Sequence, residues 1–205
     1  MLIPFSSLTR KYKFQPEGVL HIGASTGQEA QAYHELGVKR VIWIEAIPAV
    51  FVDLCRNIRK YPGHEAVQAC ISDTTGESVK FHISSNEAQS SSMLEFGTHS
   101  QVHPDVTFVD EIELKTSRVD DLVLDLECID FLNIDLQGCE LLALRGMGKL
   151  LSQFKFAYLE INEKELYQGC PLFGELNSWM RSKGFSFKEK KMCGGFGWGD
   201  AFYIR

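Results

Sequence analysis

The segment VLHIGASTGQE, residues 19–29, constrains the fold of this chain more than any other stretch. Its first four residues form an apolar run typical of a buried strand, and Gly23 and Gly27 follow before a helix-like stretch at 28–36. Glycine adopts positive φ angles and lets a ligand approach the backbone closely. The segment therefore predicts a strand-to-helix turn, which either serves a ligand or only packs the strand against the helix.

Apolar strands and amphipathic helices then alternate along the chain. Further strands are predicted at 38–46, 66–73, 128–135 and 154–161, and helices at 48–61, 140–151 and 172–184. The last two strands, 185–191 and 200–205, leave no room for a helix between them and should pair as a hairpin. The pattern predicts an α/β fold with a Rossmann-like, doubly wound sheet, mostly parallel, with a C-terminal antiparallel hairpin.

Two extended insertions interrupt this alternation, at 78–84 and 107–116. The polar stretch at 84–93 beside them is long enough to be a functional loop. With 205 residues, we expect one domain over 1–205, with a lead-in at 1–17.

Charge and cysteine content exclude several classes of function. The formal net charge of −6 argues against a nucleic-acid-binding surface, because neutralising phosphates needs clustered Lys and Arg, and only 188–191 forms a basic run. The six cysteines form no C-x-x-C pair and fit neither a zinc site nor a disulfide framework. No stretch approaches 18 consecutive apolar residues, so we expect a cytoplasmic protein with free thiols and no membrane span.

Polar side chains stand at the predicted carboxyl ends of the strands, where ligands bind in this architecture. Glu45 follows Gly23 by 22 residues and is placed to accept hydrogen bonds from both hydroxyls of a ribose; the alternative is a solvated or helix-capping glutamate. Ser72 and Asp73 either contact an adenine or form a plain turn. Asp135, Glu160 and Asn162 end the next two strands.

The first turn lacks the groups that bind phosphates. It has neither the third glycine of G-x-G-x-x-G nor the lysine of a P-loop, and Glu29 would repel a pyrophosphate at the helix start. These features favour a nucleoside without phosphates that carries an amino-acid tail, which describes S-adenosylmethionine. A nicotinamide-dependent oxidoreductase is disfavoured for the same reason.

From about Val19 onward the chain resembles the FkbM-type methyltransferases, a branch of the class I S-adenosylmethionine-dependent enzymes. The resemblance rests on VLHIGASTGQEA, VIWIEAIP, CISDTTGESVKFHIS, QSSSM, IDFLNIDLQGCELLALRGMGKLL and GWGDAFYIR in that order. It implies these cofactor-binding residues: Gly23, Ala24, Ser25 and Gly27 around the methionine part, Glu29, Glu45 and Ala46 for the amino group and ribose, and Ser72 and Asp73 near the adenine. His21 departs from the pattern, because class I enzymes often carry an acidic residue there, and Glu29 is expected to take part of its role.

The reaction needs an aligned acceptor and, for a hydroxyl, a base. Asp135 is the first candidate for the catalytic base or acceptor-orienting group, and Glu160 is the second catalytic candidate. Other interpretations are that Asp135 only caps a helix, or that it binds magnesium together with Glu160 and Asn162. His103 is an alternative base.

The chain has Asp135-Leu136-Gln137-Gly138 where amino-directed nucleobase enzymes carry [DN]-P-P-[YFW], so oxygen methylation is favoured. The resemblance implies an acceptor hydroxyl on a sugar or glycan. Alternatives are a polyketide-type metabolite or a catalytically silent nucleoside-binding scaffold. The expected substrate-binding residues are His103, Asn162, Trp198 and Asp200, where Trp198 with Phe196 stacks on a sugar face or only packs the hairpin.

Overall fold

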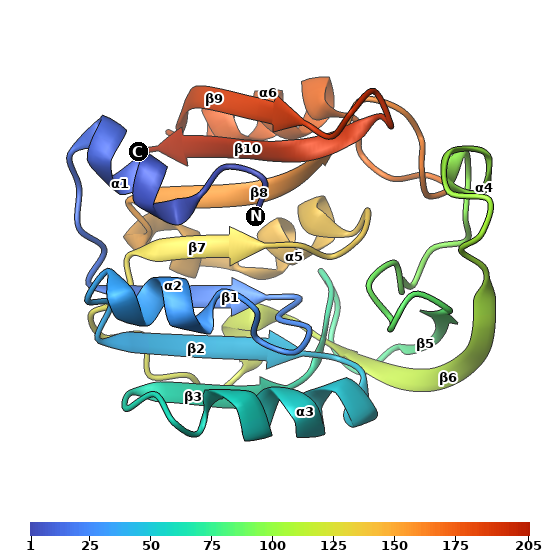
Figure 1. Ribbon diagram of the computed structural model, residues 1–205, viewed down its shortest axis with the longest axis horizontal. Coiled ribbons are helices and arrows are strands. Elements are labelled where there is room, and N and C mark those ends of the chain that lie inside the picture. Colours follow the sequence, from blue (N-terminus) through green and yellow to red (C-terminus); the bar gives the residue numbers. More distant parts are fainter.

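A seven-stranded sheet forms the centre of the computed structural model, which describes residues 1–205 (Figure 1). Its strand order is β3-β2-β1-β7-β8-β10-β9, and all neighbours are parallel except β10, which runs antiparallel to β8 and β9. The strands are β1 (Gly18–Ile22), β2 (Arg40–Glu45), β3 (His64–Gln68), β7 (Phe131–Ile134), β8 (Phe156–Asn162), β9 (Ser186–Met192) and β10 (Trp198–Ile204). The predicted mostly parallel sheet with a reversed C-terminal hairpin is confirmed.

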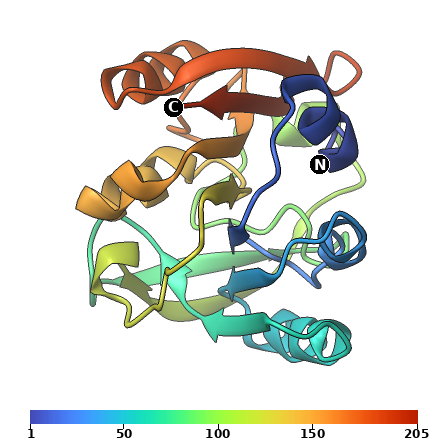
Figure 2. The ribbon, with the colours of Figure 1, turned by 90° about the vertical axis from the view of Figure 1, so that its left-hand side faces the viewer.

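Helices cover both faces of this sheet, which Figure 2 shows edge-on. One face carries α1 (Phe5–Tyr12), α2 (Ala30–Glu35) and α3 (Pro48–Ile58); the other carries α5 (Glu140–Gly146) and α6 (Phe173–Ser182), with 3-10 turns at Val119–Asp121 and Gly148–Gln153. A strand covered on both faces is apolar throughout, and β1 and β7 are accordingly buried at every residue.

A second, three-stranded sheet lies beside the first. It consists of β4 (Cys70–Ile71), β6 (Phe108–Ser117) and β5 (Ser78–Ser84) in that order. The strand predicted at 66–73 therefore divides, because after Gln68 the chain leaves the main sheet and β4 pairs with β6. The segment between β5 and β6, with α4 (His99–Val102), lies beyond the carboxyl ends of the main strands (Figure 1).

Two helices differ from the sequence-based expectation. α1 occupies the expected lead-in and buries Phe5 and Leu8 against the sheet. The helix predicted at 140–151 ends at Gly146, where a side chain would lie 2.1 Å from the carbonyl oxygen of Ser72, and continues as a 3-10 turn. The six cysteines are all free thiols, as predicted, and every helix is too short or too polar to traverse a bilayer.

Gly23 shows what approaches the first turn so closely. Its φ angle is +78°, and a Cβ atom there would lie 1.7 Å from the carbonyl oxygen of Asp135, which follows β7. Asp135 in turn donates its backbone N–H to the carbonyl of Ile22 at 3.0 Å. The glycine is therefore required by the neighbouring strand, and a ligand meets the turn only on its remaining side.

We expect Gly23→Ala to lower the free energy of unfolding more than Gly184→Ala. Both positions have a φ near +80°, which costs an L-residue about 1–2 kcal/mol, but Gly184 has nothing within 4 Å of the added atom. The clash at Gly23 should add roughly 1–3 kcal/mol, because the backbone of two paired strands must shift. Urea denaturation of the two variants measures the difference, and equal losses would contradict this account.

Candidate active site

A cavity of about 460 Å³ lies at the carboxyl ends of the parallel strands, between them and the loop after β5. Its volume falls within the range of roughly 300–1,000 Å³ typical of small-molecule and cofactor sites. Ten of the residues predicted from the sequence line it: Gly23, Ala24, Ser25, Glu29, Glu45, Ala46, His103, Asp135, Glu160 and Trp198. The others, which are Gly27, Ser72, Asp73, Asn162 and Asp200, lie outside the lining.

Glu45 shapes the wall on the β1 and β2 side. Its carboxylate is 6% exposed; one oxygen accepts the N–H of Ser25 at 2.9 Å and the other accepts the N–H of Ile47 at 2.8 Å. Burial raises the pKa of Glu45, and these backbone hydrogen bonds oppose that shift. A carboxylate has about four acceptor positions, so each oxygen keeps one for a ligand hydroxyl.

Three residues predicted to bind the cofactor lie outside the cavity lining. A side chain at Gly27 would meet Leu54 and Ile58 of α3 at 2.9 and 3.1 Å, so this glycine permits close packing of the turn against the helix. Ser72 and Asp73 follow the point where the chain leaves the main sheet: the N–H of Ser72 bonds the second sheet at 3.0 Å, and the carbonyl of Asp73 accepts from Arg118 at 2.8 Å. Cys70 and Ile71 line the cavity in their place.

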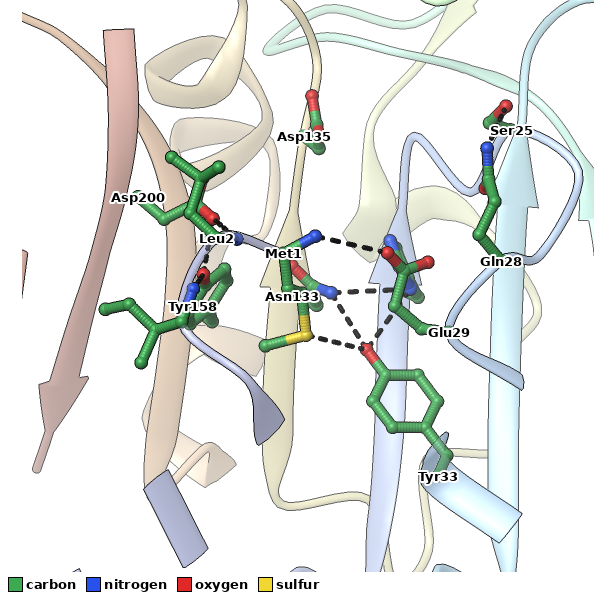
Figure 3. A network of polar contacts seen from close by, with 12 residues as sticks. Met1, Leu2, Ser25, Gln28, Glu29, Tyr33, Asn133, Asp135, Tyr158 and Asp200 are labelled. Atoms are coloured by element: carbon green, nitrogen blue, oxygen red, sulfur yellow. Dashed lines mark hydrogen bonds and ion pairs between the residues drawn. The ribbon is translucent and has the colours of Figure 1, made fainter. Parts of the chain in front are cut away.

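The N-terminal segment engages two other predicted residues, as Figure 3 shows. Glu29 lies 3.3 Å from the amino group of Met1; burial opposes ionisation of Glu29, but His21 and this amino group lower its pKa. Asp200 accepts hydrogen bonds from the N–H of Leu2 and the hydroxyl of Tyr158. Asp200 therefore joins β10 to the N-terminal segment and lies outside the lining, whereas Trp198, with which it was expected to bind a substrate, lines the cavity.

His21, at the position where class I enzymes often carry an acid, is a member of the core. It is 3% exposed, stacks on Trp43 with ring centroids 4.9 Å apart, and its Nδ1 lies 3.3 Å from the hydroxyl of Tyr33. Burial lowers the pKa of His21 to about 4, so the ring is neutral near pH 7. It cannot replace the negative charge of a carboxylate.

Gln137 joins the two predicted catalytic carboxyl groups. Its Nε2 donates to Asp135 Oδ1 at 2.7 Å and lies 3.0 Å from both carboxyl oxygens of Glu160. Its Oε1 accepts from the hydroxyl of Tyr167 at 2.6 Å, and its backbone has a φ of +51°. The loop that presents it is fixed by Glu140, which accepts the N–H groups of residues 136 and 138 at 2.9 and 3.1 Å.

Sequence reasoning assigned no role to Gln137 or Tyr167. Gln137 stands inside the D-L-Q-G segment, but its left-handed backbone, which aims the amide at both carboxyl groups, has no signal in an isolated sequence. Tyr167 follows β8 in a stretch without periodicity, and only the fold brings it to Gln137.

The carboxyl groups of Asp135 and Glu160 both have raised pKa values. Burial raises the pKa of Asp135 to about 6, Asp200 adds to the shift, and the hydrogen bond from Gln137 opposes it. Burial and repulsion from Asp135 and Glu140 raise the pKa of Glu160 well above its usual value. Near pH 7, Asp135 is therefore mostly ionised, and Glu160 keeps its proton to a higher pH than an exposed glutamate does. The Asp135 side chain remains accessible from the cavity, which suits a group that accepts a proton.

The magnesium arrangement considered from the sequence is not formed. The amide nitrogen of Gln137, a hydrogen-bond donor, stands between the two carboxyl groups, and Asn162 is buried outside the lining with neither side-chain amide atom bonded. No group of three or more His, Cys, Asp or Glu side chains is arranged to hold a metal ion.

The fold is that of the class I methyltransferases. A ChlM magnesium protoporphyrin IX methyltransferase from Synechocystis superposes with a TM-score of 0.58 at 11% identity, over 98% of this chain and 75% of that one. An Aeropyrum pernix fibrillarin superposes with a TM-score of 0.52 at 14% identity, over 93% and 67% of the two chains. At these identities the likeness establishes the fold alone.

Residues 21–187 match the FkbM methyltransferase domain, so the chain belongs to the FkbM methyltransferase family. This match confirms the predicted family, and the family uses S-adenosylmethionine, the predicted cofactor. A curated relative, the 2-O-methyltransferase NoeI of Sinorhizobium fredii, is 28% identical over 160 residues. This match covers 74% of the chain but only 65% of the length of NoeI.

We expect Glu45→Gln to weaken the binding of S-adenosylmethionine and of S-adenosylhomocysteine to the same extent. The change removes a charged acceptor that faces the cavity, and the loss of such a hydrogen bond costs about 1.5–3 kcal/mol, or roughly one to two decades of affinity. Ser72→Ala is the matched control, because the structure places that hydroxyl outside the cavity, and it should bind normally. Calorimetric titration of both variants tests the assignment. Normal cofactor affinity in Glu45→Gln, or weakened affinity in Ser72→Ala, would contradict it.

Proposed function

We propose that this enzyme transfers a methyl group from S-adenosylmethionine to a hydroxyl group of a sugar or glycan. The observation that carries the proposal is the Asp135–Gln137–Glu160 group, which faces the same cavity as Glu45 and the first turn. A base at this place is needed for a hydroxyl acceptor. The relationship to NoeI, a 2-O-methyltransferase, supports oxygen as the methylated atom.

The residues present fit the cofactor. Glu45 has free acceptor positions for the ribose hydroxyls, and Cys70, Ile71 and Leu136 offer apolar surface for the adenine. Gly23, Ala24 and Ser25 leave an open backbone surface for the methionine part, with Ala46 beside them. Glu29 lies close enough to the cavity to attract an ammonium group.

When bound, S-adenosylmethionine supplies a methyl group already activated by a sulfonium. The protein then has to hold the acceptor oxygen in line with that methyl group, and such alignment supplies on the order of 7–11 kcal/mol. Ionised Asp135 accepts the proton of the acceptor hydroxyl as the new C–O bond forms. Gln137 holds Asp135 and Glu160 in fixed positions, and its amide donates to oxygens of both groups, which limits the repulsion between them.

Methyl transfer to a panel of saccharides, with the product position established by NMR, tests the proposal directly. Appearance of an O-methyl sugar together with S-adenosylhomocysteine is the expected result. Methylation of nitrogen, or of only non-carbohydrate hydroxyls such as those of polyketides, would contradict it.

We expect Asp135→Asn to lower turnover by about 10²–10⁴-fold with little change in cofactor affinity, because the lost interaction is made mainly in the transition state. In the unmodified enzyme, kcat/KM should rise with pH through about 6, as Asp135 loses its proton. Asp110→Asn makes the same chemical change on the exposed surface of β6 and should leave the rate unchanged. If Asp135→Asn turns over as fast as the unmodified enzyme, the base is Glu160 or His103 instead. If a chelator abolishes activity and added magnesium restores it, Asp135 belongs to a metal site and is not a base.

Gln137 is a positioning residue, and its removal should alter the pH profile as well as the rate. The hydrogen bond from Gln137 lowers the pKa of both carboxyl groups, so Gln137→Ala should move the rising limb of the pH profile to higher pH. Tyr167→Phe leaves the amide in place and should produce a smaller shift in the same direction. A lower rate with an unmoved profile would show that Gln137 only supports the fold.

A further inference from the structure

The cavity has an end formed mostly by segments outside the main sheet. This acceptor end consists of Gln89 and Ser90 from the loop after β5, His99 of α4, His103 at its C-cap, Tyr167, and Trp198 at the start of β10. It is joined to the Asp135–Gln137–Glu160 group by the hydrogen bond between Tyr167 and Gln137. Figure 1 shows that the segment carrying α4 lies beyond the carboxyl ends of the strands.

A chain of hydrogen bonds ties this end to the catalytic carboxyl groups. The Tyr167 hydroxyl contacts both Gln137 Oε1, at 2.6 Å, and the carbonyl of Ser90, at 3.2 Å. The Ser90 hydroxyl lies 3.2 Å from Nε2 of His99. A ligand held here is therefore positioned relative to Asp135 by bonded side chains and not by loose loops.

The groups that face this end are polar, and none of them is an acid, a lysine or an arginine. His99 is 3% exposed, and its Nδ1 has no hydrogen-bond partner in the protein. Burial lowers the pKa of His99 to about 4, so this ring is neutral. Gln89 is exposed and Trp198 is half-buried, so an amide and an indole ring are accessible from the cavity.

The side chains of the lining include acids but no lysine or arginine. Glu29, Glu45, Asp135 and Glu160 line the cavity, and the ammonium group of Met1 lies 3.3 Å from Glu29, on the side of the first turn. An anionic group that enters beside Asp135 is repelled by its carboxylate, because the local dielectric constant is lower than that of water. A phosphate, sulfate or carboxylate group at the acceptor end would meet no lysine or arginine side chain.

We infer that the acceptor end binds an uncharged saccharide and discriminates against one that carries a phosphate, sulfate or carboxylate near the reacting hydroxyl. This inference rests on the proposed function and adds the charge class of the substrate. The indole of Trp198 offers an apolar face with a polar edge for a sugar ring, and the exposed amide of Gln89 offers hydrogen bonds to its hydroxyls.

Matched saccharide pairs test the inference. Neutral methyl glycosides and oligosaccharides are compared with their 6-phosphates and with the corresponding uronic acids, with the release of S-adenosylhomocysteine as the measurement. Transfer to neutral members, with kcat/KM at least about tenfold lower for their charged partners, is expected. Equal or faster transfer to a charged partner would overturn the inference and leave the proposed function standing. Transfer to no saccharide of either set would overturn both.

A charge introduced at the acceptor end provides a second test. Gln89→Lys should raise kcat/KM for a 6-phosphate relative to the neutral partner by about tenfold, because it supplies the missing cation. Val109→Lys is the control: it adds the same charge at a position 63% exposed and outside the lining, and the ratio should not change. Equal ratios for the two variants would remove Gln89 from the acceptor end and overturn the placement.

Discussion

The pairing of β1 with β7, drawn together at Gly23, is the constraint on which the rest of this molecule depends. The carbonyl of Asp135 occupies the space that a side chain at Gly23 would fill. This contact puts the first turn and the Asp135 loop at one edge of the sheet. The expected cofactor site and the proposed base therefore line the same cavity. Gly23, which the sequence suggested as a ligand-binding glycine, is thus required for β1 and the end of β7 to lie side by side.

Burial of carboxyl groups gives the site its chemistry. Glu140 and Glu160 are buried, Asp135 lies near them at the cavity, and all three have raised pKa values. Such crowding is tolerated because Gln137 and backbone N–H groups donate to the oxygens. The lining around these groups holds no lysine or arginine side chain. The proposed base and the proposed discrimination against anions therefore rest on the same group of carboxyl side chains.

Much of the fold was predictable because its signals are local. The apolar runs of β1, β2, β7 and β8 and the closing hairpin each stand out within a few residues, and Glu45 and Asp135 could be located by counting to the strand ends. The predicted residues Ser72, Asp73 and Asp200 lie outside the lining for a different kind of reason. Their positions depend on the path of distant or following segments. The chain leaves the main sheet after Gln68 and forms β4 in the second sheet, and the N-terminal segment packs on β10.

The sequence by itself determined the class of fold, the family, the cofactor, and the positions of Glu45 and Asp135, because periodicity and motif spacing are properties of neighbouring residues. Only the tertiary structure decided which polar groups meet. Gln137 reaches both Asp135 and Glu160, Tyr167 supports Gln137, and the loop after β5 closes the acceptor end, across separations of up to 77 residues. Hydrogen bonds and pKa shifts depend on distances in space, and those distances exist only after the sheet has brought its strand ends together.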